Sequence, residues 1–221
     1  MPPLRGGGHD GGNRIMNNAI RGGACILLAT LAASCASTGV EFVPIRDMHP
    51  SYLGITVEAP GSEGWLVSEK RYEAGWRILF RHEDHDDRSR TRAVFVKADR
   101  YDAGGFVRAH GSLQELARSV FKETRDSSGK DKRFQEKWAE LVRDDIHGAE
   151  AYRIRIAWEE RRNPHYPDAV LVLEVVQLLM LHRHDPDEIV SVAASTRRRL
   201  EQEPISADAL ASSFFRSMRF E

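Results

Sequence analysis

The sequence predicts an α+β domain in which an antiparallel-rich sheet is flanked by helices. Three observations support this prediction. Short β-branched and aromatic runs fill the first half, apolar residues take on helical spacing in the middle, and strand-like runs return before a terminal helical segment. The chain has 221 residues, of which 41% are hydrophobic, so we expect one domain with a substantial core.

The first half contains four strand-like runs. Each is short, rich in β-branched or aromatic residues, and bounded by glycine, Pro-Gly or charged turns. We expect each of them to form a strand. They cover residues 53–57, 64–67, 76–80 and 91–98.

The middle of the chain predicts two helices. Ser112 and Glu115 have the spacing of a capping box, and apolar residues follow them at helical spacing. These residues are Leu113, Leu116, Ala117, Val120 and Phe121. We expect a second helix at residues 131–143, where apolar residues also recur at helical spacing. They are Phe134, Trp138, Leu141 and Val142.

Strands return in the second half. Alternating residues predict a half-buried strand at 152–158, and the run at 169–181 is apolar on both faces, as in a central strand that is covered on both sides. A further strand is expected at 188–194. A terminal helix begins at Ser206, and we expect three of its apolar residues to face the sheet. They are Leu210, Phe214 and Met218.

Composition and motifs exclude several classes of protein. The 32 Lys and Arg residues against 33 Asp and Glu give a formal net charge of -1, so a dedicated nucleic-acid binder is not expected. Two cysteines are too few for a disulfide framework. The sequence has no Gly-x-Ser-x-Gly elbow and no phosphate-binding glycine loop. We therefore assign no catalytic residue and expect no cofactor.

Residues 16–35 have the three regions of a secretory signal. Arg21 supplies the positive charge, residues 24–33 form a largely apolar run, and small residues lead to Cys35. The apolar run would span only about half of the ~30 Å hydrocarbon core as a helix, so it is too short to be a permanent membrane helix. Residues 1–15 show no apolar periodicity, and both Met1 and Met16 remain possible initiators.

The end of this segment resembles the lipobox of bacterial lipoproteins. It reads Leu31-Ala32-Ala33-Ser34-Cys35, with Ala32 where that family has Leu, Val or Ile. The resemblance implies that Cys35 carries acyl chains such as palmitate and begins the mature protein. Ala36 after it implies the outer membrane, facing the periplasm. Cleavage without lipidation is the alternative.

The chain is then divided into three parts. We expect a leader and signal peptide at 1–34, a tether at 35–51 and a single head domain at 52–221. The order of elements in the head, the Ser195-Thr196-Arg197 exit from its last strand and the closing segment 214–220 resemble the Mog1/PsbP-like α/β/α sandwich. That family hosts accessory and binding proteins, so the resemblance implies a role of this kind.

Two histidine-rich segments are candidate metal sites. His82 and His85 lie among four carboxylates, and His182 and His184 are followed by a second acidic run. Imidazole and carboxylate groups suit zinc, copper or calcium, but neither segment matches an EF-hand or a His-Glu-x-x-His motif. Solvated turns are the alternative, and the sequence does not show whether the two segments meet in space.

Two further groups are expected to be structural. Arg197-Arg198-Arg199 could meet lipid phosphates, but we expect a solvated strand edge. Tryptophans could line a ligand groove, but we expect core packing. They are Trp65, Trp76, Trp138 and Trp158.

These observations favour a non-enzymatic envelope lipoprotein. Its head would bind another envelope protein or a small ligand, and its lipid anchor would hold it on the membrane. The alternative is a periplasmic metal-binding protein or metal-dependent enzyme that uses His82, His85, His182 and His184.

Overall fold

The computed structural model describes residues 42–44, 50–52, 54–58, 60, 64–72, 75–146 and 148–221. The predicted signal segment, Cys35 and most of the predicted tether lie outside the described residues. Among the described residues, no helix is both long and apolar enough to cross a membrane.

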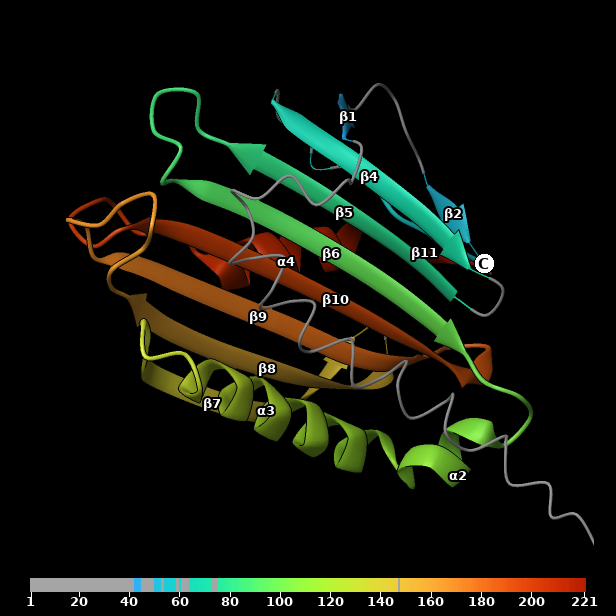
Figure 1. The fold of residues 1–221 in the computed structure, drawn as a ribbon. Helices are drawn as coiled ribbons and strands as arrows, with labels where there is room; N and C mark the ends of the chain where they lie inside the picture. The colour runs from blue at the N-terminus through green and yellow to red at the C-terminus, as the bar shows by residue number, and fades with distance from the viewer. Residues whose placement is uncertain are drawn as a thin grey trace, which may run out of the picture.

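The main sheet has eight strands within the described residues, and every pairing in it is antiparallel (Figure 1). In spatial order the strands are β1 (Val43–Pro44), β4 (Trp65–Tyr72), β5 (Gly75–Glu83), β6 (Thr91–Arg100), β10 (Asp185–Arg199), β9 (Leu171–His182), β8 (Ala149–Glu160) and β7 (Phe134–Ile146). The α+β class with a mostly antiparallel sheet is therefore confirmed.

A small second sheet joins the two ends of the domain. The C-terminal strand β11 (Arg219–Phe220) pairs with β3 (Ile55–Thr56), which also pairs with β2 (Ser51–Tyr52). The backbone N–H of Glu221 donates to the Gly54 carbonyl at 2.7 Å, which extends this contact to the last residue. The segment expected to be a tether, residues 35–51, contains β1 and the first residue of β2. Strand β1 pairs with the main sheet and β2 with the small one, so part of this segment belongs to the folded domain.

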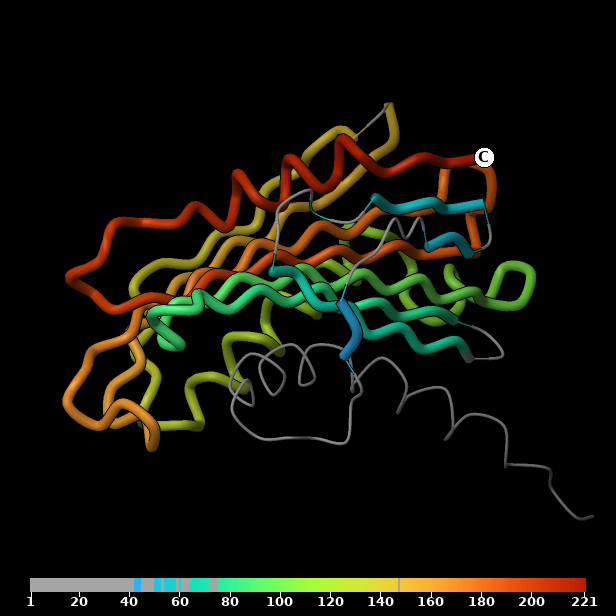
Figure 2. Tube along the Cα trace, turned by 90° about the horizontal axis from the view of Figure 1, so that it is seen from above, coloured from blue at the N-terminus to red at the C-terminus, as the bar shows by residue number. Residues whose placement is uncertain are grey.

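Helices lie on both faces of the main sheet. Helix α3 (Leu113–Gly129) follows the short α2 (Gly105–His110) and covers one face, and α4 (Ala207–Ser217) lies on the other (Figure 2). Both predicted caps are confirmed, because Ser112 accepts from the Glu115 N–H at 3.2 Å and Ser206 accepts from the Ala209 N–H at 3.0 Å. The short α2 was not predicted.

Each helical layer closes a separate apolar core. Beneath α4, Phe214 packs against Phe80 of β5 with ring centroids 5.6 Å apart. Beneath α3, Leu116 and Val120 join Ile154 and Trp158 of β8. The prediction of a doubly covered strand at 169–181 is confirmed, because residues of β9 belong to both cores.

The predicted helix at 131–143 is wrong, because this segment is strand β7. It pairs with β8 over nearly its whole length, and a register shift between Glu136 and Trp138 reverses which residues face α3. Phe134 and Leu141 therefore face α3, whereas Trp138 faces the opposite side and is 45% exposed. The apolar residues that suggested a helix therefore lie on both faces of the strand, with Phe134 and Leu141 on one face and Trp138 and Val142 on the other, which is why the pattern misleads.

Truncation of a core side chain on α4 should test the packing of this layer. We expect Phe214→Ala to lower the free energy of unfolding by about 3–5 kcal/mol, because it removes a buried ring and leaves a cavity. Ser213→Ala at the neighbouring exposed position is the matched control and should change it by less than about 0.5 kcal/mol. Urea denaturation followed by circular dichroism would measure both. Equal losses in the two variants would contradict this packing.

Candidate functional site

The first pair of candidate metal ligands lies at the end of β5 and in the loop after it. His82 stacks edge-on against Trp65, with ring centroids 5.5 Å apart, and its ring nitrogens lie 3.2 Å from the Arg92 guanidinium. The His85 side chain is fully exposed and lies 3.3 Å from Asp86. Because a guanidinium occupies the neighbourhood of His82, this position does not resemble a cation site.

The second pair lies in the turn between β9 and β10. The rings of His182 and His184 are 5.9 Å apart, and the His184 backbone N–H donates to Nδ1 of His182 at 3.3 Å. His182 is buried and also contacts Phe220 of the C-terminal strand, with ring centroids 5.4 Å apart.

The structure does not bring the two histidine pairs together. His82 of β5 pairs with Arg92 of β6, and Arg92 pairs in turn with Thr196 near the C-terminal end of β10. His182 pairs with Asp185, which is the first residue of β10. At about 3.3 Å per residue, these ends of β10 are on the order of 30 Å apart. Within the part of the chain that the structure describes, no three His, Cys, Asp or Glu side chains are grouped as a metal site.

Two other expectations need correction. Arg197 is only 2% exposed, so it is not part of a solvated edge; its guanidinium donates to the Arg88 carbonyl and lies over the Tyr166 ring. Trp65, Trp76 and Trp158 are buried as expected, whereas Trp138 lies on the exposed edge strand β7.

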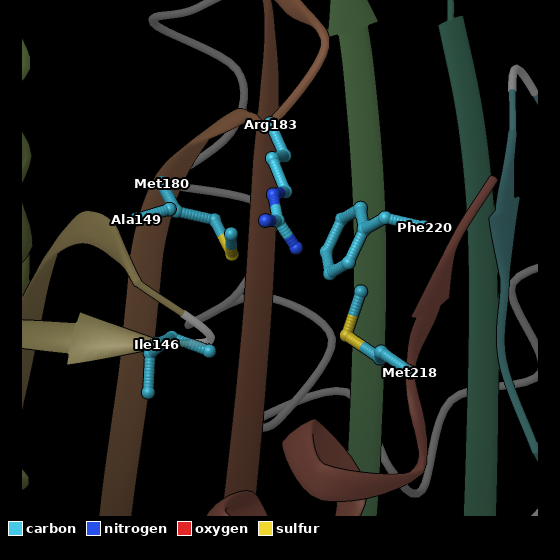
Figure 3. A pocket seen from close by; sticks show the side chains of 6 residues that line it. All are labelled: Ile146, Ala149, Met180, Arg183, Met218 and Phe220. Atoms are coloured by element: carbon cyan, nitrogen blue, oxygen red, sulfur yellow. The ribbon is translucent and has the colours of Figure 1, made fainter.

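A cavity of about 150 Å³ lies at the end of the sheet near the chain terminus. The β7–β8 turn, strand β9 and the C-terminal segment form its walls (Figure 3). Five of the six lining side chains are apolar and the sixth is a cation. They are Ile146, Ala149, Met180, Met218, Phe220 and Arg183.

Arg183 gives this cavity its chemical character. Arg183 is exposed, and its guanidinium lies between Met180 and Phe220 at the cavity (Figure 3). Within the described residues, Arg183 forms no ion pair with a carboxylate. A cation beside apolar walls suits an anionic group that carries a short apolar body. The six lining side chains thus offer a guanidinium and apolar contact to a bound molecule.

Two buried ionisable groups lie at the same end of the sheet. Burial lowers the pKa of His182, and the neighbouring His184 adds to this effect while Asp185 opposes it. Burial also raises the pKa of Glu188 to about 7, with a further rise from Asp185 and an opposing effect of Arg100. His182 is therefore neutral near pH 7, whereas Glu188 is about half ionised there, so the strand end carries less charge than its composition indicates.

The sequence singled out His182 and His184 and missed Arg183 between them. The sequence feature that could have indicated the cavity is the apolar C-terminal segment, because its residues Met218 and Phe220 line it. Their proximity to Arg183 depends on the pairing of β11 with β3, which leaves no local pattern in the sequence.

The raised pKa of Glu188 predicts a pH-dependent stability. A folded-state pKa above the ordinary 4.5 means that the folded protein binds this proton more tightly, so stability falls as pH rises through about 7. We expect Glu188→Gln to raise the free energy of unfolding by roughly 1–3 kcal/mol at pH 8 and to change it little at pH 5. Exposed Glu203→Gln is the control. Denaturant melts at both pH values would measure the difference, and an equal effect of Glu188→Gln at both would refute it.

Comparisons with known proteins find a likeness among solved structures and none among sequences. No family model matches the chain, and no curated protein sequence matches it. Among solved structures, the chain is similar to the solution structure of cyanobacterial PsbP (CyanoP) from Synechocystis sp. PCC 6803. The TM-score is 0.49 and the sequence identity 14%, over 85% of this chain and 97% of that one. This likeness does not bear on ligand or activity.

Proposed function

We propose that this chain is a lipid-anchored envelope protein whose head domain binds a small ligand and is not an enzyme. The sequence of residues 16–35 supports the anchor, with acylation at Cys35 and outer-membrane delivery implied by Ala36. The absence of a catalytic motif in the sequence and the lining of the cavity support a binding role. A head domain of the Mog1/PsbP-like type is part of this proposal, and helices on both faces of an antiparallel sheet support it.

The ligand class follows from one observation, the Arg183 guanidinium beside five apolar side chains. A carboxylate would pair with the guanidinium, and a short aliphatic body would contact Met180, Met218 and Phe220. The cavity is smaller than the 300–1,000 Å³ or so of drug-sized sites, so the ligand has few heavy atoms. We therefore propose a short-chain carboxylic acid.

The metal-dependent alternative has no supporting observation in the structure. Its two candidate pairs, His82 with His85 and His182 with His184, lie at opposite ends of the sheet, and among the described residues neither pair belongs to a group of three possible metal ligands.

Removal of the Arg183 charge should weaken binding. We expect Arg183→Gln to lower the affinity for hexanoate about tenfold or more, because a charge-assisted hydrogen bond contributes roughly 1.5–3 kcal/mol. Arg118→Gln, on the exposed face of α3, is the matched control and should leave the affinity unchanged. Isothermal titration calorimetry would measure both. Equal affinity of Arg183→Gln and the unmodified protein would exclude this ligand site.

The anchor makes a separate prediction. The intact mass of protein extracted from membranes should match a chain that begins at Cys35 and carries acyl chains. Cys35→Ser should move the protein from the membrane pellet to the supernatant. A native protein that keeps residues 1–34, or that begins at Cys35 without acyl groups, would refute the lipid anchor.

A further inference from the structure

The chain enters the main sheet at one edge. Val43 of β1 pairs with Val67 of β4, and Pro44 pairs with Leu66. Eight residue steps separate Cys35 from Val43, so even a fully extended chain reaches only about 27 Å between them. The other edge strand, β7, lies seven strand intervals away, or about 34 Å at ~4.8 Å per interval. An anchor at Cys35 would thus hold the β1–β4 side nearest the membrane.

This side of the sheet combines apolar and cationic side chains. We call it the entry edge, defined as Val43, Leu66, Lys70, Arg71, Arg77 and Arg81. Val43 and Leu66 are 43% and 37% exposed, and Lys70 and Arg71 are exposed on the same strand pair. Arg77 lies opposite Lys70, and Arg81 lies opposite Leu66. The Arg81 guanidinium also lies over the ring of Phe42, where the described chain begins.

Acidic residues offset only part of this charge. Glu69 pairs with Arg71 at 2.8 Å, and Glu83 pairs with Arg81. Asp99 pairs with Lys97 on β6. Strands β4, β5 and β6 together carry seven Lys or Arg and three Asp or Glu. Strands β7 and β8 carry four Lys or Arg and seven Asp or Glu, so charge is separated across the sheet.

We infer that the entry edge docks on an anionic phospholipid surface when Cys35 is anchored in the bilayer. This inference rests on the proposed lipid anchor and adds the orientation of the head. Lys70 and Arg71 are attracted to lipid phosphates, and Val43 and Leu66 enter the interfacial region. The acidic β7 edge is repelled by the same surface and points away from it.

Two similarly exposed positions allow a matched test of this orientation. Leu66→Cys and Val142→Cys place one thiol at the entry edge and one on β7, where Val142 is 38% exposed and Leu66 is 37% exposed. In the processed, acylated protein Cys25 has left with the signal and Cys35 is blocked, so an environment-sensitive dye reports only the new position. Protein extracted from membranes would be reconstituted into phosphatidylcholine vesicles with or without phosphatidylglycerol, with a lipid-borne quencher.

We expect quenching at position 66 to exceed that at position 142 several-fold in vesicles with phosphatidylglycerol. The excess should shrink without this lipid or at high salt, because screening shortens electrostatic attraction. The double variant Lys70→Gln with Arg71→Gln should abolish the excess quenching at position 66. The control double variant on β7, Lys137→Gln with Arg143→Gln, likewise removes two positive charges and should leave the excess quenching unchanged.

The outcomes separate the two proposals. Acylated protein in which both positions are quenched equally, or in which position 142 is quenched more, would overturn the docking and leave the anchor intact. Loss of the excess in the β7 double variant as well would overturn the assignment to the entry edge. An intact mass without acyl groups on Cys35 would overturn the anchor itself.

Discussion

The need to cover strands β9 and β10 on both faces determines the rest of the fold. Neighbouring residues of β9, such as Val175 and Val176, belong to the two different cores, so neither face tolerates water. Helix α4 covers one face and helix α3 the other. Helices α2 and α3, which connect β6 to β7, carry the chain across the face opposite α4. The chain then forms β7 at the far edge of the sheet and returns through β8, β9 and β10, which gives the order β6-β10-β9-β8-β7.

The cavity arises where this layered packing ends. Helix α4 stops at Ser217, and the chain turns into β11, which pairs with β3 rather than with the main sheet. A space remains between the C-terminal segment and the β7–β8 turn, and apolar side chains line it. Arg183 reaches this space because the β9–β10 turn lies beside it. A binding role fits this place, since the lining offers one charge and otherwise only apolar contact.

The formal net charge of -1 conceals a separation of charge across the sheet. Basic residues predominate on β4, β5 and β6, and acidic residues on β7 and β8. Many of the β7 and β8 charges form cross-strand ion pairs, including Arg155 with Glu140 and Lys137 with Glu159. Such pairs contribute little stability at the surface, but they protect a long edge strand from pairing with another chain. The proposed orientation of the head on a membrane rests on this separation of charge.

The sequence by itself determined the α+β class, most strands and both capped helices, and it carries the predicted export signal and Cys35. Caps and alternation depend on residues a few positions apart, which is why Ser112 and Ser206 mark helix starts correctly. Only the tertiary structure decided that 131–143 is a strand, because its bulge acts through pairing with β8. It also decided the burial of Arg197, the separation of the histidine pairs and the place of Arg183. These features depend on contacts between residues far apart in the chain, and such contacts leave no periodic signal in the sequence.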